Sequence, residues 1–146
     1  MSQKFIYNTR YPSVEDLKIK AKKRIPKFAF DYLTGGANEE LNLARNENDF
    51  DNILLKPQYL LASEEIDLSV ELFGRRYSAP FGVSPIGLQG LMWPNAPEIL
   101  AKAAAKNDVP YILSTVSTSS IERIAEVSDG KAWFQLYHPT ENRLRD

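Results

Sequence analysis

Uncharged polar residues stand at three points of this chain where short apolar runs end. Ser84 closes the first run, Ser114 and Thr115 close the second, and Gln135 and Tyr137 close the third. Hydroxyl, amide and phenol groups donate and accept hydrogen bonds without adding a formal charge. Such groups can orient the polar edge of a heterocycle or a carboxylate, so we expect a binding surface where these run ends meet.

Gln135 is the most informative of these residues. Its amide lies within the run AWFQLY, and an unpaired amide in a dry core is costly, so it requires hydrogen-bond partners. Backbone groups or an ordered water are one source of partners. The alternative is a donor and acceptor pair directed at a heterocycle, which three polar run ends in succession favour.

The stretch 79–94, APFGVSPIGLQGLMWP, indicates how a flat ligand would be approached. It starts as an apolar strand, breaks at Ser84-Pro85 and continues as a loop that contains Gly87 and Gly90. Glycine has no side chain, so the backbone around it can come close to a ligand. Such turns are common in barrels and sandwiches, and for Gly90 we expect a role in the turn only.

Strands and helices alternate around these residues. We predict strands over 81–84, 111–114 and 132–137, and helices over 97–107 and 120–127. This order is typical of βαβ units with right-handed crossovers and a parallel sheet, so the fold class is α/β. Strands of such a sheet are apolar on both faces, and ligands bind at their carboxyl ends, where the polar residues stand.

Local signals refine these helices. Ser119 and Glu122 have the spacing of a capping box. Alanines at 101 and 103–105 would let the first of the two helices lie close to the sheet.

The residues before this region predict a helical extension. A helix over 13–25 has Ser13 as its N-cap and acidic residues in its first turn. Pro26 starts a second helix, which Gly35-Gly36 ends, with Phe28, Ala29, Tyr32 and Leu33 on one face. A third, polar helix runs over about 38–48.

A β-hairpin is predicted after these helices. Strand character begins at Ile53, and Gly74-Arg75 predicts the turn of the hairpin. We therefore divide the chain into an extension over 1–78 and the first βα units over 79–146.

The composition is that of a soluble globular protein. The 146 residues carry a net charge of -1, with basic residues dispersed, so a broad surface for nucleic acid is not expected. The absence of cysteine and the single histidine, His138, argue against disulfides and metal sites. No run approaches the length of a membrane span or a signal peptide, which predicts a cytoplasmic location.

Four segments resemble those of the FMN-dependent 2-hydroxy acid oxidases and dehydrogenases, which include glycolate oxidase, L-lactate dehydrogenase and mandelate dehydrogenase. They are PKFAFDYLTGGANE, SPIGLQGLMWP, LSTVSTSSIE and WFQLY, in the same order and at similar spacing. The resemblance implies the N-terminal part of a (β/α)8 barrel that binds FMN and converts an L-2-hydroxy acid to a 2-keto acid.

The resemblance also implies roles for individual residues. The backbone of Pro85, Ile86 and Gly87 would lie against the flavin ring, and Ser114 and Gln135 would hydrogen-bond its polar edge. Ile86 stands where the family has threonine, and glycine rather than alanine at position 87 favours a dehydrogenase over an oxidase.

Two tyrosines are implied in substrate binding. Tyr32 would help to hold the substrate carboxylate, and Tyr137 would lie near the substrate hydroxyl and act in catalysis. His138 directly follows WFQLY, whereas the family's histidine base belongs to a later strand, so we do not assign it a catalytic role. Val116 and Glu47 depart from common family residues, which leaves the substrate's identity open.

The chain is shorter than a complete barrel, which bears on whether it is active by itself. A (β/α)8 barrel needs about 250 residues, and the resemblance places the family's lysine, histidine base, arginine and phosphate-binding loops beyond Asp146. We therefore expect the isolated chain to be inactive. Alternatives are a fragment that needs a complementing chain, or another flavin- or phosphate-binding barrel such as a relative of inosine monophosphate dehydrogenase.

The family often forms tetramers, and peripheral association with the inner membrane is an alternative to a purely cytoplasmic location.

Overall fold

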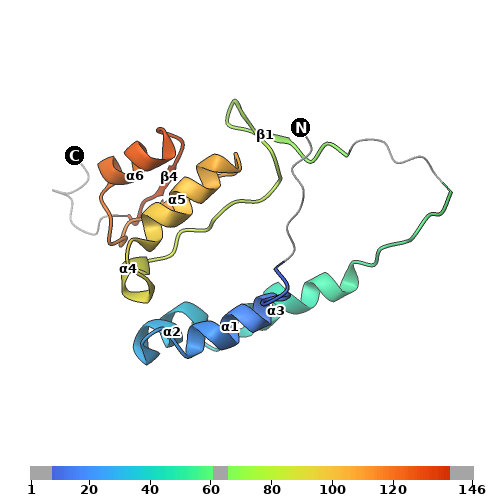
Figure 1. The fold of residues 1–146 in the computed structure, drawn as a ribbon, viewed down its shortest axis with the longest axis horizontal. Coiled ribbons are helices and arrows are strands. Elements are labelled where there is room, and N and C mark those ends of the chain that lie inside the picture. Colours follow the sequence, from blue (N-terminus) through green and yellow to red (C-terminus); the bar gives the residue numbers. More distant parts are fainter. Residues whose placement is uncertain (1–7, 61–65, 139–146) are drawn as a thin grey trace. The chain divides into compact units, whose positions relative to one another are not determined.

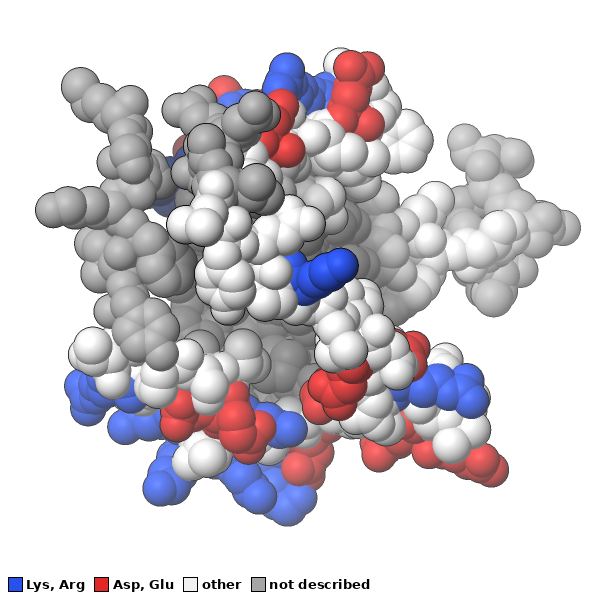
Figure 2. Space-filling model, turned by 90° about the vertical axis from the view of Figure 1, so that its right-hand side faces the viewer, with Lys and Arg blue, Asp and Glu red and all other residues white. Residues whose placement is uncertain are grey.

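The chain forms two compact units, which divide between Leu54 and Leu55 (Figure 1). The computed structural model describes residues 8–60 and 66–138. In the view of Figure 2, acidic and basic side chains are interspersed, and no broad area of a single sign appears among the described residues on this face. Each unit is described by itself below.

The first unit contains three helices and a short 3-10 helix. They are α1 (Val14–Lys22), α2 (Lys27–Thr34), α3 (Leu41–Asn48) and η1 (Asp49–Asn52). Ser13 is confirmed as the N-cap of α1: its Oγ accepts a hydrogen bond from the Asp16 amide at 3.2 Å, and its own amide donates to the Asp16 carboxylate at 3.0 Å. This reciprocal pair satisfies two amides that the first helical turn leaves without partners.

Helix α2 begins and ends where the sequence predicts, but its buried side differs. Pro26 precedes the helix, and the Gly35 amide closes it by donating to the Asp31 carbonyl at 2.8 Å. The buried residues are Ala29 and Phe30, whereas Phe28 is exposed. The predicted apolar face is therefore only partly correct. Of its four residues only Ala29 is buried, and the other buried residue, Phe30, is its neighbour in sequence.

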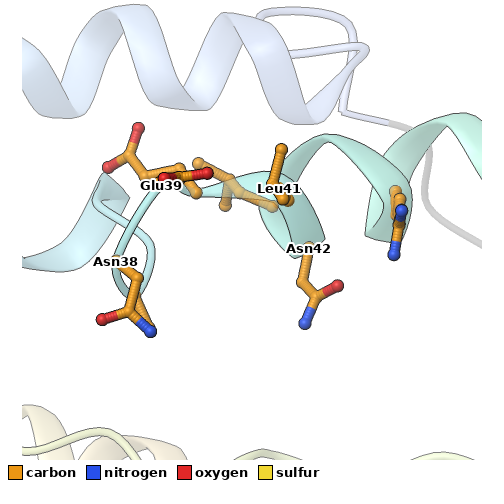
Figure 3. Close-up of a pocket in the computed structure, with 8 residues that line it drawn as sticks. Asn38, Glu39, Leu41 and Asn42 are labelled. Carbon is orange, nitrogen blue, oxygen red and sulfur yellow. The ribbon is translucent and has the colours of Figure 1, made fainter.

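A surface hollow of about 440 Å³ lies where α3 begins (Figure 3). Its lining comes from one continuous stretch, residues 37–43, together with Arg45. None of the predicted cofactor or substrate residues belongs to this lining.

The strand expected from Ile53 onward is absent from the described structure. Residues 53–59 adopt no regular structure, and Leu54 and Leu55 are almost fully exposed. An alternating or apolar pattern forms a stable strand only when a neighbouring strand supplies its hydrogen bonds, and no described strand pairs with this segment.

The second unit opens with the predicted hairpin. Strands β1 (Val70–Leu72) and β2 (Arg75–Tyr77) pair antiparallel, with Leu72 opposite Arg75. The turn is Phe73-Gly74, one residue earlier than expected, and both residues have positive φ angles of 51° and 73°. Two positive φ angles match the twist of a two-residue hairpin, and glycine adopts such an angle without steric cost.

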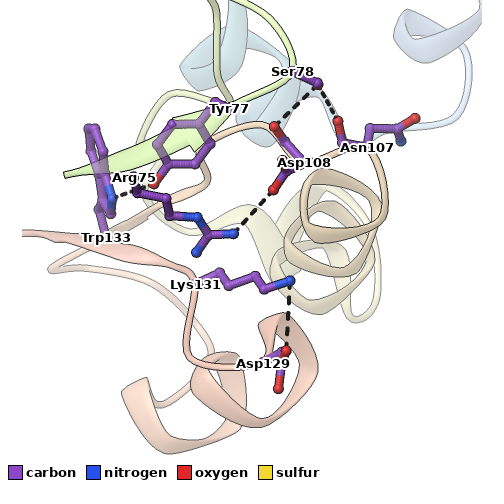
Figure 4. Close-up of polar contacts among 8 residues, drawn as sticks. All are labelled: Arg75, Tyr77, Ser78, Asn107, Asp108, Asp129, Lys131 and Trp133. Carbon is purple, nitrogen blue, oxygen red and sulfur yellow. Dashed lines mark hydrogen bonds and ion pairs between the residues drawn. The ribbon is translucent and has the colours of Figure 1, made fainter. Parts of the chain in front are cut away.

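The hairpin packs against the amino end of the following sheet (Figure 4). The indole Nε1 of Trp133 donates to the Tyr77 hydroxyl at 3.1 Å, and Tyr77 is only 2% exposed. Arg75 forms an ion pair with Asp108 at 3.2 Å. Ser78 is also anchored there, because its Oγ donates to the Asn107 carbonyl at 2.6 Å.

Two predicted βα units follow in the expected order. The helices are α5 (Ala96–Lys106) and α6 (Ile121–Ser128), and the strands are β3 (Ile112–Ser114) and β4 (Trp133–Gln135). β3 and β4 pair in parallel, which confirms the α/β class. The core joins the helices to the sheet through Ala101, Ala104, Leu113 and Ile124.

Three details of this region differ from the sequence predictions. The strand expected over 81–84 is reduced to one parallel bridge between Val83 and Tyr111, and Phe81 is 68% exposed. A short helix, α4 (Gln89–Met92), lies in the expected loop. The N-cap of α6 is Ser120 rather than Ser119, since the Ser120 Oγ accepts from the Arg123 amide at 3.2 Å.

The shortness of the first strand has a local cause. Prolines flank the segment at 80 and 85, and proline cannot donate a hydrogen bond to a neighbouring strand. The remaining bonds run from the Val83 amide to the Pro110 carbonyl at 2.8 Å and from the Ile112 amide to the Val83 carbonyl at 3.1 Å. These two bonds still place the segment beside β3.

Candidate functional site

Ser114 and Gln135 are register partners at the carboxyl ends of β3 and β4. Leu113 belongs to the core that α5 and α6 cover, so by alternation Ser114 lies on the opposite face of the sheet. Gln135 shares that face, because directly paired residues of parallel strands point to the same side. The structure thus brings together two of the residues predicted to bind the cofactor.

The two side chains have free hydrogen-bonding capacity. The Ser114 Oγ accepts a weak hydrogen bond from the Val116 amide at 3.3 Å, which leaves its hydroxyl hydrogen available. The side-chain amide of Gln135 makes no hydrogen bond to another described residue, although the residue is partly buried. Ser114 is 3% exposed and Gln135 is partly buried, so a hydroxyl and a side-chain amide with unused hydrogen-bonding capacity lie together at a largely covered edge of the sheet.

The loop after Val83 lies beside these residues and is tied to the loop after β3. The Leu88 amide donates to the Val116 carbonyl at 3.0 Å, and the Gly90 amide donates to the Thr118 Oγ1 at 3.1 Å. Within the loop, Pro85 is exposed, Ile86 is partly buried and Gly87 is buried. The amides of Ile86 and Gly87 donate no hydrogen bond to another described residue.

Gly90 does more than form a turn, contrary to the expectation from sequence. It lies in α4, and a Cβ atom built there would come within 2.4 Å of the Thr118 Oγ1 and 3.0 Å of the Thr118 Cβ. Only glycine allows this close approach. The contact fixes the spacing between the two loops at the carboxyl edge.

A buried polar cluster beneath α4 escaped the sequence analysis. The Tyr111 hydroxyl donates to the Gln89 Oε1 at 3.2 Å, and both residues are at most 3% exposed. The Ser119 Oγ donates to the Glu98 Oε1 at 2.9 Å. Burial, and then the negative charge of Glu98, raises the pKa of Tyr111 to about 12. A glutamine inside an apolar loop and a tyrosine at the start of an apolar strand were the available signals.

The two tyrosines predicted to bind substrate lie in different units. Tyr137 follows β4 and is 55% exposed, and its amide donates to the Thr115 Oγ1 at 2.9 Å. Tyr32 lies in α2 of the first unit and is 51% exposed. A shared role for the two phenols therefore stays a prediction. His138 is exposed beside Tyr137.

A second surface hollow, of about 370 Å³, lies away from these polar residues in the second unit. It is lined by the start of the Val83 segment and one side of α5, with Phe81, Leu100 and Val109 as its larger apolar side chains. None of the predicted site residues lines it. Among the described helices, none is long and apolar enough to cross a bilayer.

Two curated proteins are similar to this chain in sequence. (S)-Mandelate dehydrogenase of Pseudomonas putida is 42% identical over 125 residues, which make up 86% of this chain and 32% of that protein. L-Lactate dehydrogenase of Ectopseudomonas mendocina is 43% identical over 122 residues, or 84% of this chain and 32% of that protein. The chain thus spans about a third of the length of these curated relatives.

Solved structures agree with the sequence comparison. An oxidized active mutant of (S)-mandelate dehydrogenase matches with a TM-score of 0.75 and 43% identity, over 85% of this chain and 35% of that structure. A mandelate oxidase matches with a TM-score of 0.80 and 34% identity, over 92% of this chain and 39% of that structure. Residues 21–146 match the family of FMN-dependent dehydrogenases, and with this fold and these relatives the chain belongs to that family.

Proposed function

We propose that this chain forms one wall of an FMN site in an enzyme that oxidises an L-2-hydroxy acid to a 2-keto acid. The register pairing of Ser114 with Gln135 at the carboxyl edge of the sheet carries this proposal. The family is FMN-dependent, which confirms the cofactor expected from the sequence. We further propose that the strands are the first of a (β/α)8 barrel.

The residues at the carboxyl edge fit the polar edge of a flavin ring. That edge carries carbonyl oxygens and ring nitrogens, which require both donors and acceptors, and the Gln135 amide with the Ser114 hydroxyl offers both. An amide without a described partner gains most from such a ligand, because its desolvation cost is otherwise uncompensated. When bound, FMN supplies the two-electron acceptor that none of the twenty side chains provides.

The loop beside these residues fits a flat ring face. Pro85 and Ile86 offer apolar surface, and Gly87, although buried, adds no side chain that would hold a ligand away from the backbone. We propose that glycine at position 87 favours reaction with an acceptor other than oxygen, and hence a dehydrogenase. Ile86 would contribute packing where a threonine would contribute a hydroxyl.

Tyr137 is our candidate for contact with the substrate. It is two residues beyond Gln135, the last residue of β4, so a substrate stacked near the flavin would lie within reach of a phenol there. A phenol can orient a hydroxyl or carboxylate without placing a full charge in the site. We propose that Tyr32 supplies a second phenol for the carboxylate. Mandelate and lactate, named by the relatives, are the substrates to test first.

We propose that the 146-residue chain does not turn over substrate by itself. The resemblance implies a lysine, a histidine base and an arginine, and we assign none of these roles to a residue of this chain. The fragment would require a complementing part of the barrel. Identities of 42–43% to mandelate and lactate dehydrogenases favour this account over a different phosphate-binding barrel.

The location and assembly also remain proposals. We propose a cytoplasmic location with a tetrameric assembly of the complete protein, and peripheral association with the inner membrane as the alternative. A solved relative is described as a soluble mutant of the membrane-associated (S)-mandelate dehydrogenase of Pseudomonas putida, which supports testing the alternative by membrane fractionation.

Flavin binding and dye reduction test the two parts of this proposal separately. A protein that joins this chain to the complementing part of the barrel is titrated into FMN while flavin fluorescence is recorded, and the isolated chain is offered an artificial dye with L-mandelate or L-lactate. We expect saturable FMN binding and no dye reduction. Absence of FMN binding would contradict the proposed site, whereas dye reduction would contradict the proposed inactivity of the isolated chain.

A further inference from the structure

We infer that Thr115 is a positioning residue that sets the place of Tyr137 relative to the flavin edge. This inference rests on the proposed function of the carboxyl edge, and Thr115 itself is not proposed to touch cofactor or substrate. It is carried by one hydroxyl that makes two hydrogen bonds. The Thr115 Oγ1 donates to the Gln135 carbonyl and accepts from the Tyr137 amide at 2.9 Å.

The backbone geometry explains why this hydroxyl matters. The β3–β4 ladder ends at the Ser114–Gln135 pair, and β3 then turns away, with the Ser117 amide donating to the Ser114 carbonyl at 3.0 Å. Without another partner, the backbone beyond Gln135 would leave the sheet at that point. The Thr115 side chain takes the place of the missing strand and holds the chain for two residues beyond the end of β4.

The same loop also holds the opposite side of the site. Val116 accepts from the Leu88 amide, and Thr118 accepts from the Gly90 amide. Residues 115–118 therefore connect the loop after Val83 with the end of β4. The two threonines of this loop bind different segments. Thr118 accepts a hydrogen bond from Gly90 in α4, and Thr115 accepts one from the Tyr137 amide after β4.

Two matched substitutions separate these roles. Thr115→Val and Thr118→Val each remove one hydroxyl at nearly constant volume, and Thr115→Ser restores the hydroxyl. Amide hydrogen exchange is measured at Tyr137 and Gly90 in each variant. We expect exchange at Tyr137 to rise about tenfold in Thr115→Val, as for the loss of a hydrogen bond of about 1.4 kcal/mol.

The control pattern is equally specific. Thr118→Val is expected to accelerate exchange at Gly90 and not at Tyr137, and Thr115→Ser is expected to stay within about twofold of the unsubstituted chain. Unchanged exchange at Tyr137 in Thr115→Val would overturn the inference. So would an equal rise at Tyr137 in Thr118→Val, because that would show general loosening.

Flavin emission tests the functional consequence. A phenol close to an isoalloxazine ring quenches its fluorescence by electron transfer, which weakens steeply with distance. In an FMN-bound protein that contains this chain and the complementing part of the barrel, emission of Thr115→Val should shift toward that of Tyr137→Phe, with FMN affinity changed less than about twofold. Emission equal to the unsubstituted chain would overturn the positioning role. If FMN fails to bind, the proposed function fails, and the exchange pattern alone decides whether Thr115 holds Tyr137.

Discussion

Ser114 and Gln135 face the same side of the sheet as direct register partners, each the last residue of its strand. Neither strand end alone defines a site, since a polar residue often terminates a strand. Their pairing places a hydroxyl and an amide side by side, opposite the face covered by helices. This relationship, joined to the loop after Val83, is the basis of the proposed flavin edge.

Gly90 provides a test in which two effects oppose each other. Gly90→Ala would gain up to about 1 kcal/mol from helix propensity, but its Cβ would meet the Thr118 Oγ1 at 2.4 Å. Overpacking of this kind costs about 1–3 kcal/mol, so we expect a lower free energy of unfolding in urea. Adding Thr118→Ala should recover part of the loss. Stability equal to or above that of the unsubstituted chain would show that the two loops separate without cost.

The Tyr111 phenol predicts a loss of stability at high pH. Its pKa is raised from 10.0 to about 12 by burial and by the charge of Glu98. The unfolded chain therefore releases this proton first, and the stabilising contribution is complete below pH 10 and declines as the pH rises toward 12. The decline amounts to about 2 kcal/mol for this group.

Tyr111→Phe should remove that part of the decline. Urea unfolding between pH 9 and pH 11.5 measures it, with Tyr137→Phe as a control that removes an exposed phenol and should keep the decline. Parallel curves for the unsubstituted chain and Tyr111→Phe would contradict the burial of an ionisable group at this position.

The hairpin should stabilise the second unit mainly through Tyr77. Tyr77→Ala removes a buried ring and is expected to cost about 3–5 kcal/mol, whereas Tyr77→Phe leaves the Trp133 indole without its acceptor and costs about 1–3 kcal/mol. Arg75→Ala breaks a partly exposed ion pair and should cost about 1 kcal/mol or less. Urea denaturation gives the order of the three variants, and an Arg75 effect as large as that of Tyr77→Ala would contradict this ranking.

Gly87 should control the choice of electron acceptor. In a catalytically active protein that contains this chain, Gly87→Ala is expected to raise the rate of oxygen reduction severalfold relative to dye reduction, because a methyl group changes access at the ring face. Parallel assays of oxygen consumption and dye reduction give the ratio. If the ratio does not change, residue 87 has no part in acceptor choice.

Sequence patterns located the parts of the fold that depend on local chemistry. The N-cap of α1 and the terminating glycine of α2 follow from residue types at fixed offsets, and the polar ends of β3 and β4 stand out against apolar strands. Ser114 and Gln135, which we propose as flavin-binding residues, were identified for the same reason, and the structure shows only that they are register partners.

Contacts between distant residues were not predictable in this way. The hydrogen bond between Gln89 and Tyr111 and the close approach of Gly90 to Thr118 join segments more than twenty residues apart. The strand predicted at 81–84 is reduced to a single bridge because flanking prolines limit its pairing. The apolar content of the segment alone does not indicate this effect. Thr115 was noted as a polar strand end, but its bridging role depends on where β3 turns.

FMN affinity tests the central claim most directly. In a protein that contains this chain and the complementing part of the barrel, dissociation constants from flavin fluorescence are compared for the unsubstituted chain, Ser114→Ala and Gln135→Leu, with Gln58→Leu as the same substitution at an exposed position of an irregular segment. Loss of hydrogen bonds worth about 1.4 kcal/mol predicts about tenfold weaker binding for Gln135→Leu, a smaller effect for Ser114→Ala and no change for Gln58→Leu. Equal affinity in Gln135→Leu and the unsubstituted chain would contradict the proposed flavin edge.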